Sequence, residues 1–180
     1  MIFTESPLRG AFLVDMSPLA DERGFFARAY CAEEFAAQGL GFEMRQCSVS
    51  FNSSKATLRG LHFQAAPHQE HKLVRCTAGA IFDVVVDIRP GSPSYCRWFG
   101  AQLTAENRRS LYIPPGFAHG FVTLRDATEV YYMISAAHAP EYSRGYRWND
   151  PAFGIEWPLA PSVISGRDAD YPLLDAAARR

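Results

Sequence analysis

The stretch IFDVVVDIR, residues 81–89, decides the fold class of this chain. Successive side chains of an extended strand point to opposite faces, and the residues here alternate with that period of two. One face carries Phe82, Val84, Val86 and Ile88, and the other carries Ile81, Asp83, Val85 and Asp87. The pattern predicts a β-strand in which Asp83 places a carboxylate in an otherwise apolar layer. An unpaired buried charge is costly, so Asp83 is expected to have a cationic or hydrogen-bonding partner.

Similar short segments make up most of the chain, and clusters of Gly, Pro, Asn and Asp separate them. They are TLRGLHFQ (57–64), HKLVRCTAG (71–79), WFGAQLTAEN (98–107), RSLYIPPG (109–116), AHGFVTL (118–124) and TEVYYMIS (128–135). One helix signal stands out before the C-terminus, CAEEFAAQGL (31–40), with two glutamates in its first turn and Gly39 as its stop. Many short strands and a few short helices predict an all-β sandwich or barrel, and a double-sheet jelly roll suits this length best.

Length and composition set further bounds. The 180 residues predict a single domain, with a jelly-roll core at about 45–140 and an N-terminal arm and C-terminal helical segment packed around it. An apolar content of 48% excludes disorder as the main state, and a net charge of -1 gives no sign of nucleic-acid or anionic-membrane binding. The N-terminal stretch lacks the pattern of a signal peptide, and the four cysteines form no CxxC pair. We expect a cytoplasmic protein with reduced thiols.

Several ionisable residues interrupt the predicted strands. They are Arg59, His62, Lys72, Asp83, His119 and Tyr132. Each has a structural interpretation taken alone: a core or rim histidine, half of an ion pair, a core aromatic or a solvated cation. Together, a histidine, a lysine, a carboxylate and a tyrosine are the groups needed for proton transfer next to a carbonyl. We therefore expect a polar cavity inside the barrel.

A metal site is the alternative interpretation of the histidines. His62, His68, Glu70 and His71 are close in sequence, and His119 follows further on. A pair of ligands on one strand needs a spacing of two to share a face, but the residue two beyond His62 is Gln64. Pro67 also argues against a regular strand around His68 and His71. We expect no metal and no other cofactor.

Five ordered motifs carry a resemblance to a known family. They are RGLHFQ (59–64), HKLVRCTAGAIFDVVVDIRPGSPSY (71–95), YIPPGFAHGF (112–121), RGYRWNDPAFGIEWP (144–158) and ISGRDADYP (164–172), and DERGFF (21–26) also fits. The chain resembles the dTDP-4-dehydrorhamnose 3,5-epimerase family over nearly its whole length. This resemblance implies a cupin-type jelly roll, a homodimer and a metal-free epimerisation of a nucleotide-linked 4-keto-6-deoxy sugar.

The resemblance also implies roles for individual residues. His62 corresponds to the catalytic base, Asp168 to its carboxylate partner and Tyr132 to the general acid. Lys72 corresponds to a donor near the sugar that stabilises a developing enolate, and His119 also contacts the sugar. Positions that hold the nucleotide diphosphate or the sugar are Arg23, Phe26, Gln46, Arg59 and Arg167, with Arg23 lent by the neighbouring subunit. Asp83 is a further candidate in the same pocket, and it would orient the base if Asp168 does not.

Some positions depart from the pattern of the family. Arg28 replaces a common glutamate, Ser48 a usual asparagine, His138 a frequent aromatic and Ser143 a frequent glutamate. The catalytic positions are kept while several nucleotide-facing ones differ. A different nucleotide, a different 4-keto sugar or epimerisation at only one of C3 and C5 therefore stays open. So do a 3,4-ketoisomerase, a metal-dependent enzyme on the same fold and a non-catalytic sugar-binding module.

The strand around His62 contains one geometric conflict. Arg59 and His62 have opposite parity, so a regular strand would point them to opposite faces. If both serve one pocket, Gly60 should mark a bulge or a sharp twist that redirects one of them. Otherwise Arg59 would reach the ligand around the edge of the strand.

Overall fold

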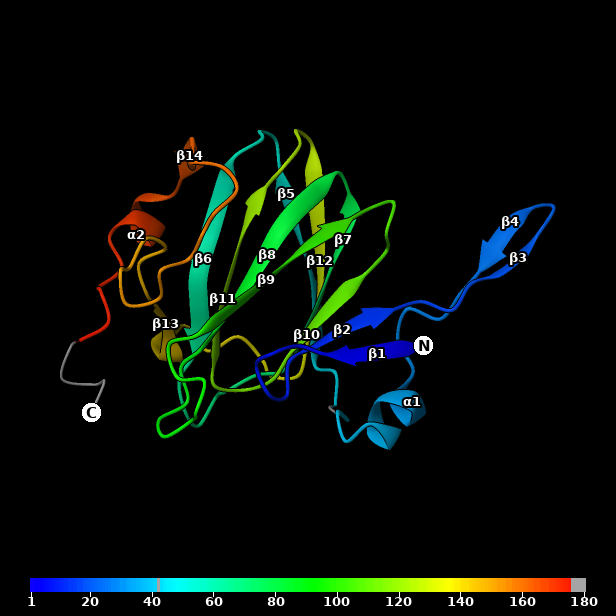
Figure 1. The fold of residues 1–180 in the computed structure, drawn as a ribbon, viewed down its shortest axis with the longest axis horizontal. Coiled ribbons are helices and arrows are strands. Elements are labelled where there is room, and N and C mark those ends of the chain that lie inside the picture. Colours follow the sequence, from blue (N-terminus) through cyan, green and yellow to red (C-terminus); the bar gives the residue numbers. More distant parts are fainter. Residues whose placement is uncertain (42, 176–180) are drawn as a thin grey trace.

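A computed structural model describes residues 1–41 and 43–175 of the chain, and two facing β-sheets form its body (Figure 1). The first sheet has the strand order β1 (Ile2–Glu5), β2 (Phe12–Asp15), β10 (Ser110–Ile113), β7 (Lys72–Ala78), β12 (Thr128–Ile134) and β5 (Gln46–Asn52). The second has the order β13 (Ser143–Gly145), β6 (Thr57–Gln64), β11 (Phe117–Thr123), β8 (Ala80–Asp87) and β9 (Trp98–Thr104), and β14 (Val163–Ile164) pairs with β6. Strands that follow one another in sequence often lie in opposite sheets, which is the connectivity of a jelly roll.

The helices of the described residues are short. They are α1 (Ala32–Ala37), α2 (Gly166–Ala169) and the 3-10 helix η1 (Pro140–Tyr142). Within the described ranges, no helix has the length and apolar character needed to cross a membrane. Helix α1 places Phe35, which is fully buried, against the outer face of the first sheet beside Leu73 and Tyr112. The helix predicted within 31–40 is confirmed, with Gln38 as its C-cap and Gly39, at a φ of +72°, as the next residue.

Strand β8 is buried on both of its faces, in agreement with the alternation of IFDVVVDIR. Ile81 and Val85 face the interior between the sheets, where they pack with Leu103, Leu111 and Phe121. Val84 and Val86 face outward into a second apolar cluster. The segment after β13 covers that outer face with Tyr146, Phe153, Trp157 and Leu174. This cover explains why the central strand carries apolar residues at nearly every position.

A bulge interrupts the pairing of β6 with β11. His62 pairs with His119 and Arg59 pairs with Phe121, so two residues of β6 oppose the single residue Gly120 of β11. Gly60 lies inside the bulge with φ of +132°, and a Cβ on it would meet the Gly120 Cα at 2.5 Å. Because His119 and Phe121 share a face, the bulge brings Arg59 to the same face as His62. Of the two geometries considered for Arg59 and His62, the structure therefore has the bulge at Gly60.

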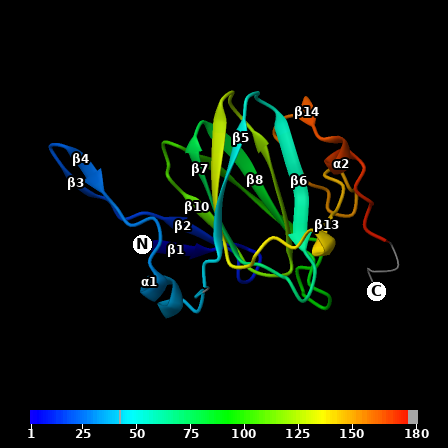
Figure 2. The same ribbon diagram turned by 180° about the vertical axis from the view of Figure 1, so that it is seen from behind.

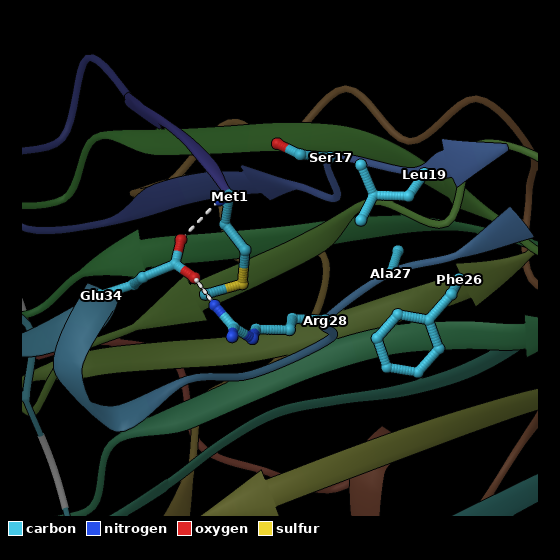
Figure 3. A pocket seen from close by; sticks show the side chains of 7 residues that line it. All are labelled: Met1, Ser17, Leu19, Phe26, Ala27, Arg28 and Glu34. Atoms are coloured by element: carbon cyan, nitrogen blue, oxygen red, sulfur yellow. Dashed lines mark hydrogen bonds and ion pairs between the residues drawn. The ribbon is translucent and has the colours of Figure 1, made fainter.

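The N-terminal part includes a ribbon that projects from the body (Figures 1 and 2). Strands β3 (Leu19–Asp21) and β4 (Gly24–Phe26) form this two-stranded ribbon. At its base the Met1 ammonium lies 2.5 Å from one Glu34 oxygen, and Arg28 donates to the other at 3.2 Å (Figure 3). These residues line a cavity of about 280 Å³ together with Leu19 and Phe26. The charge network ties the returning strand of the ribbon to the N-terminus and to α1.

Candidate active site

A polar cavity of about 290 Å³ lies between the two sheets, lined by residues of β5, β7 and β12 from the first sheet and of β6, β11 and β13 from the second. The loop before β7, residues 138–143 and helix α2 also contribute to its walls. The lining residues are Gln46, Ser48, His62, Phe63, Gln64, Glu70, Lys72, His119, Tyr132, Ile134, His138, Ser143 and Arg167. The structure therefore brings together nine of the residues singled out from the sequence.

His62 and Asp168 form a hydrogen-bonded pair at one wall of this cavity. The His62 Nε2 lies 2.7 Å from the Asp168 Oδ1, and the Gly60 amide donates to the Asp168 Oδ2 at 3.1 Å. Ser165 caps helix α2 and accepts from the Asp168 amide, which fixes the carboxylate against β6. Burial raises the pKa of Asp168, but the hydrogen bonds from His62 and Gly60 outweigh it, so the pKa lies below its ordinary value.

An ionised Asp168 fixes the tautomer of its partner. The carboxylate accepts a hydrogen bond from Nε2–H, which leaves Nδ1 of neutral His62 as the basic nitrogen. The His62 side chain is 37% exposed, whereas that of Asp168 is 6% exposed. The imidazole therefore reaches the open cavity while its partner stays behind it in the protein. This is the arrangement of a general base held by an orienting carboxylate.

Tyr132 lies on β12, in the sheet opposite that of His62. Burial raises the pKa of the phenol, the Asp83 carboxylate raises it further, and the Arg59 cation lowers it by less. The hydroxyl therefore stays protonated at neutral pH and can donate. Tyr132 lines the cavity, whereas Tyr131 on the other face of β12 interacts with Cys47. The strand register predicted for 128–135 is confirmed.

His119 has its own carboxylate partner. Its Nε2 lies 2.7 Å from Oδ1 of Asp83, and both side chains are buried. This contact confirms the expectation that Asp83 needs a partner. Asp83 contacts His119 rather than His62, so the structure places Asp168, and not Asp83, on the proposed base. The second Asp83 oxygen has no hydrogen-bond partner among the described residues.

Two cavity residues were missed as functional candidates in the sequence, Glu70 and Gln64. Lys72 Nζ lies 2.9 Å from Glu70 Oε1, and Gln64 Nε2 donates to Glu70 Oε2 at 3.0 Å. Gln64 could have been found, because it lies two residues beyond His62 on the same strand face. The sequence suggests Glu70 only as a metal ligand, because it lies among the histidines of 62–71.

The arginines of the predicted site differ in their placement. Arg167 lines the cavity, donates to the Ser143 hydroxyl at 2.8 Å and lies over the Tyr171 ring. Arg59 does not line this cavity. Its Nε donates to Asn52 Oδ1 at 2.7 Å, and its positive charge lowers the pKa of Tyr132. Arg23 lies on the projecting ribbon, where it pairs with Asp21.

Phe26 also lies on the ribbon and is 73% exposed. The cavity that it lines is the one beside Met1 in Figure 3, not the polar cavity between the sheets. The chain therefore does not bring its own Arg23 and Phe26 to the other predicted site residues.

The histidines considered as metal ligands point to different partners. His71 Nδ1 lies 2.6 Å from the Tyr112 hydroxyl, and the His68 ring packs on Tyr142 at 4.3 Å between centroids. Across 1–41 and 43–175, no group of three His, Cys, Asp or Glu residues is placed to hold a metal ion. His62 and Glu70 line the same cavity, but the described side chains of this sequence cluster do not converge on one point where a metal ion could bind.

Two facing sheets of jelly-roll connectivity with a polar cavity between them define a cupin-type protein. Comparison with known proteins agrees. The family model for dTDP-4-dehydrorhamnose 3,5-epimerase matches residues 5–176. The chain belongs to this epimerase family, so the protein is an isomerase.

Individual relatives support this assignment. The dTDP-4-dehydrorhamnose 3,5-epimerase of Salmonella typhimurium is 42% identical and covers 98% of this chain and 97% of its own length. The crystal structure of the Bacillus anthracis enzyme with TDP and PPi bound superposes with a TM-score of 0.93 at 37% identity, covering 96% and 99% of the two chains. The Legionella pneumophila enzyme in complex with dTDP-4-keto-L-rhamnose has a TM-score of 0.90 at 35% identity, with 98% and 96% covered.

Proposed function

We propose that the protein inverts C3, C5 or both in a nucleotide-linked 4-keto-6-deoxy sugar, with dTDP-4-dehydro-6-deoxyglucose as the leading substrate. The observation that carries the proposal is the placement of His62 and Tyr132 on opposite sheets around one cavity. Inversion requires that a proton leave one face of a carbon and return to the other. The bound nucleotides of the Bacillus and Legionella relatives support a dTDP-linked substrate.

In the first step, His62 removes a proton from the carbon next to the ketone. The electron pair of the broken C–H bond moves to the ketone oxygen, which becomes an enolate. Asp168 stabilises the imidazolium that forms, because its carboxylate stays ionised. Lys72 donates to the enolate oxygen, and a preorganised donor of this kind contributes on the order of 3 kcal/mol in comparable sites. The ketone itself accepts the electrons, so the proposal requires no cofactor.

In the second step, Tyr132 returns a proton to the same carbon from the opposite face. The enolate collapses to the ketone, a new C–H bond forms, and the phenol becomes a phenolate. Its raised pKa keeps Tyr132 protonated before the step. Proton exchange with water through the open cavity restores His62 and Tyr132. Repeating the cycle at the other flanking carbon inverts the second centre.

The nucleotide diphosphate is proposed to bind between two subunits of a homodimer. Arg167, Gln46, Ser48, His138 and Ser143 line the cavity from one subunit. The projecting ribbon of the other subunit would bring its Arg23 and Phe26, which lie outside the cavity of their own chain. Arginine suits a diphosphate because its forked donors grip two oxygens at once.

We also propose that the enzyme works in the cytoplasm. All four cysteines, Cys31, Cys47, Cys76 and Cys96, are free thiols, which suits a reducing compartment.

The experiment that tests the function is a deuterium-exchange screen. The protein is incubated in D2O with several nucleotide-linked 4-keto-6-deoxy sugars, and the products are followed by NMR. We expect deuterium at C3, C5 or both, with the C4 ketone retained. Exchange on none of the substrates would overturn the proposal. Movement of the carbonyl to C3 would identify a 3,4-ketoisomerase instead.

A further inference from the structure

The Lys72 side chain is held by a residue that takes no part in the proposed proton transfers. Lys72 Nζ lies 2.9 Å from Glu70 Oε1, and the two side chains are only 12% and 11% exposed. Both residues line the polar cavity. A buried pair of this kind has few alternative geometries, because each charge would lose its partner if it moved.

Gln64 in turn fixes the Glu70 carboxylate. Its Nε2 donates to Glu70 Oε2 at 3.0 Å and to the His68 carbonyl at 2.9 Å. Its Oε1 accepts from the Ala139 amide at 2.7 Å. Gln64 is buried, and these bonds join the end of β6 to the loop before β7 and to the segment that carries His138. One Glu70 oxygen is therefore held by Gln64, which leaves the other to hold Lys72.

The hydrogen bonds that hold Glu70 matter because a lysine side chain is flexible. Its ammonium is a point charge at the end of a flexible four-carbon stem, so its position is not set by the backbone alone. A donor stabilises a developing enolate only if it is already in place when the charge forms. The Glu70 carboxylate offsets part of the lysine charge, which by itself would weaken the stabilisation of an enolate. The benefit of Glu70 is therefore geometric, because it fixes the ammonium in one place.

We propose that Glu70, held by Gln64, is a positioning residue that places the Lys72 ammonium against the substrate ketone oxygen. The proposal rests on the proposed function, since it presupposes that Lys72 donates to the enolate. Because the role is geometric, a neutral side chain of the same length with an acceptor oxygen should fill it.

The test compares Glu70→Met with Glu70→Gln. Methionine has a similar length but offers no strong acceptor, so we expect kcat to fall about 30-fold while KM and the affinity for dTDP change less than about threefold. Glutamine keeps one acceptor oxygen for Lys72 but loses the acceptor that faces Gln64 Nε2, so we expect a smaller loss of kcat, up to about fivefold. If Glu70→Met does not fold, Glu70→Asp takes its place; its acceptor is one methylene short, and we expect about a tenfold loss of kcat.

A double-mutant cycle with Lys72→Met separates positioning from a structural role. If Glu70 acts through Lys72, adding Glu70→Met to Lys72→Met should cost less than about threefold. Glu141→Met, on the exposed helix η1, is the control and should leave kcat unchanged. Retention of more than a third of kcat by Glu70→Met, or an equal further loss in the Lys72→Met background, overturns the inference. A wild-type protein without exchange on any substrate would instead overturn the proposed function.

Discussion

At the scale of single residues, the separation of acid from base gives the sharpest expectation. Tyr132→Phe removes one hydroxyl and leaves the ring packed in the cavity. His62 can still remove a proton and return solvent deuterium to the same face, but delivery from the opposite face is lost. We predict that deuterium wash-in continues at a reduced rate while inverted product largely disappears, as measured by NMR in D2O.

Tyr131→Phe is the matched control for that experiment. Tyr131 lies next to Tyr132 on β12, but it faces away from the cavity and interacts with Cys47. It should keep full epimerisation. Loss of inversion in Tyr131→Phe with retention in Tyr132→Phe would contradict the assignment of Tyr132 as the acid.

The residue scale also shows where sequence reasoning works and where it stops. The apolar pattern of its strand predicts that the Asp83 carboxylate has a partner, and the structure shows a hydrogen bond with His119. The roles of His62, Asp168, Tyr132 and Lys72 remain predictions, although the structure brings all four to one site. Glu70 was missed because it lies in an irregular loop, where strand periodicity says nothing about side-chain direction.

At the scale of elements, the β6 bulge is the feature on which the site depends. Gly60 has φ of +132°, and an added Cβ would lie 2.5 Å from the backbone of Gly120. We predict that Gly60→Ala lowers the free energy of unfolding by at least about 3 kcal/mol and abolishes activity. Urea unfolding measures the loss. Gly41→Ala is the control, because its Cβ would make only ordinary contacts, and it should change stability by less than about 1 kcal/mol.

A second element-scale expectation concerns acid stability of the turn after β8. Burial raises the pKa of Asp87, but hydrogen bonds from Arg89, Ser92 and Ser94 outweigh it and lower the pKa from 3.8 to about 2. A depressed pKa gives stabilisation that is present above about pH 4 and lost as the pH falls towards 2. The difference corresponds to about 2 kcal/mol.

We therefore predict that wild-type stability falls between pH 4 and pH 2 by about 2 kcal/mol more than the stability of Asp87→Asn. Urea unfolding at pH 4, 3 and 2 measures both proteins. Other carboxylates titrate alike in the two proteins and cancel in the comparison. Parallel pH profiles would contradict the prediction.

The sequence predicts strands β6 to β12 but not β1 to β5, β13 or β14. Strands β6 to β12 have apolar or turn patterns that point to a buried face. Strand β5 shows why such a prediction can fail, because its polarity is reversed. Gln46 and Ser48 face inward to the polar cavity, whereas Val49 and Phe51 are 59% and 58% exposed on the other face. A strand that lines a polar cavity does not show the usual pattern of an apolar inner face.

At the scale of the whole molecule, the proposed dimer predicts complementation between inactive variants. Arg23→Ala would disable the site of the partner, whereas His62→Asn disables the site of its own chain. A mixed dimer then has one site with both residues intact. Random mixing should restore about a quarter of wild-type activity, because half of the dimers are mixed and each has one working site.

Steady-state rates of refolded equal mixtures measure the effect, and each variant refolded alone is the control. Mixtures no more active than the average of the two variants would place Arg23 in the site of its own chain, or outside any site.

The central claim, that the His62–Asp168 pair is the base, is tested most directly by deuterium wash-in with His62→Asn. The base acts in the transition state and adds little to ground-state affinity. We predict that exchange at every carbon of the 4-keto sugar falls below about 1% of the wild-type rate, while the affinity for dTDP is unchanged. More than a tenth of the wild-type exchange rate in His62→Asn would contradict the assignment.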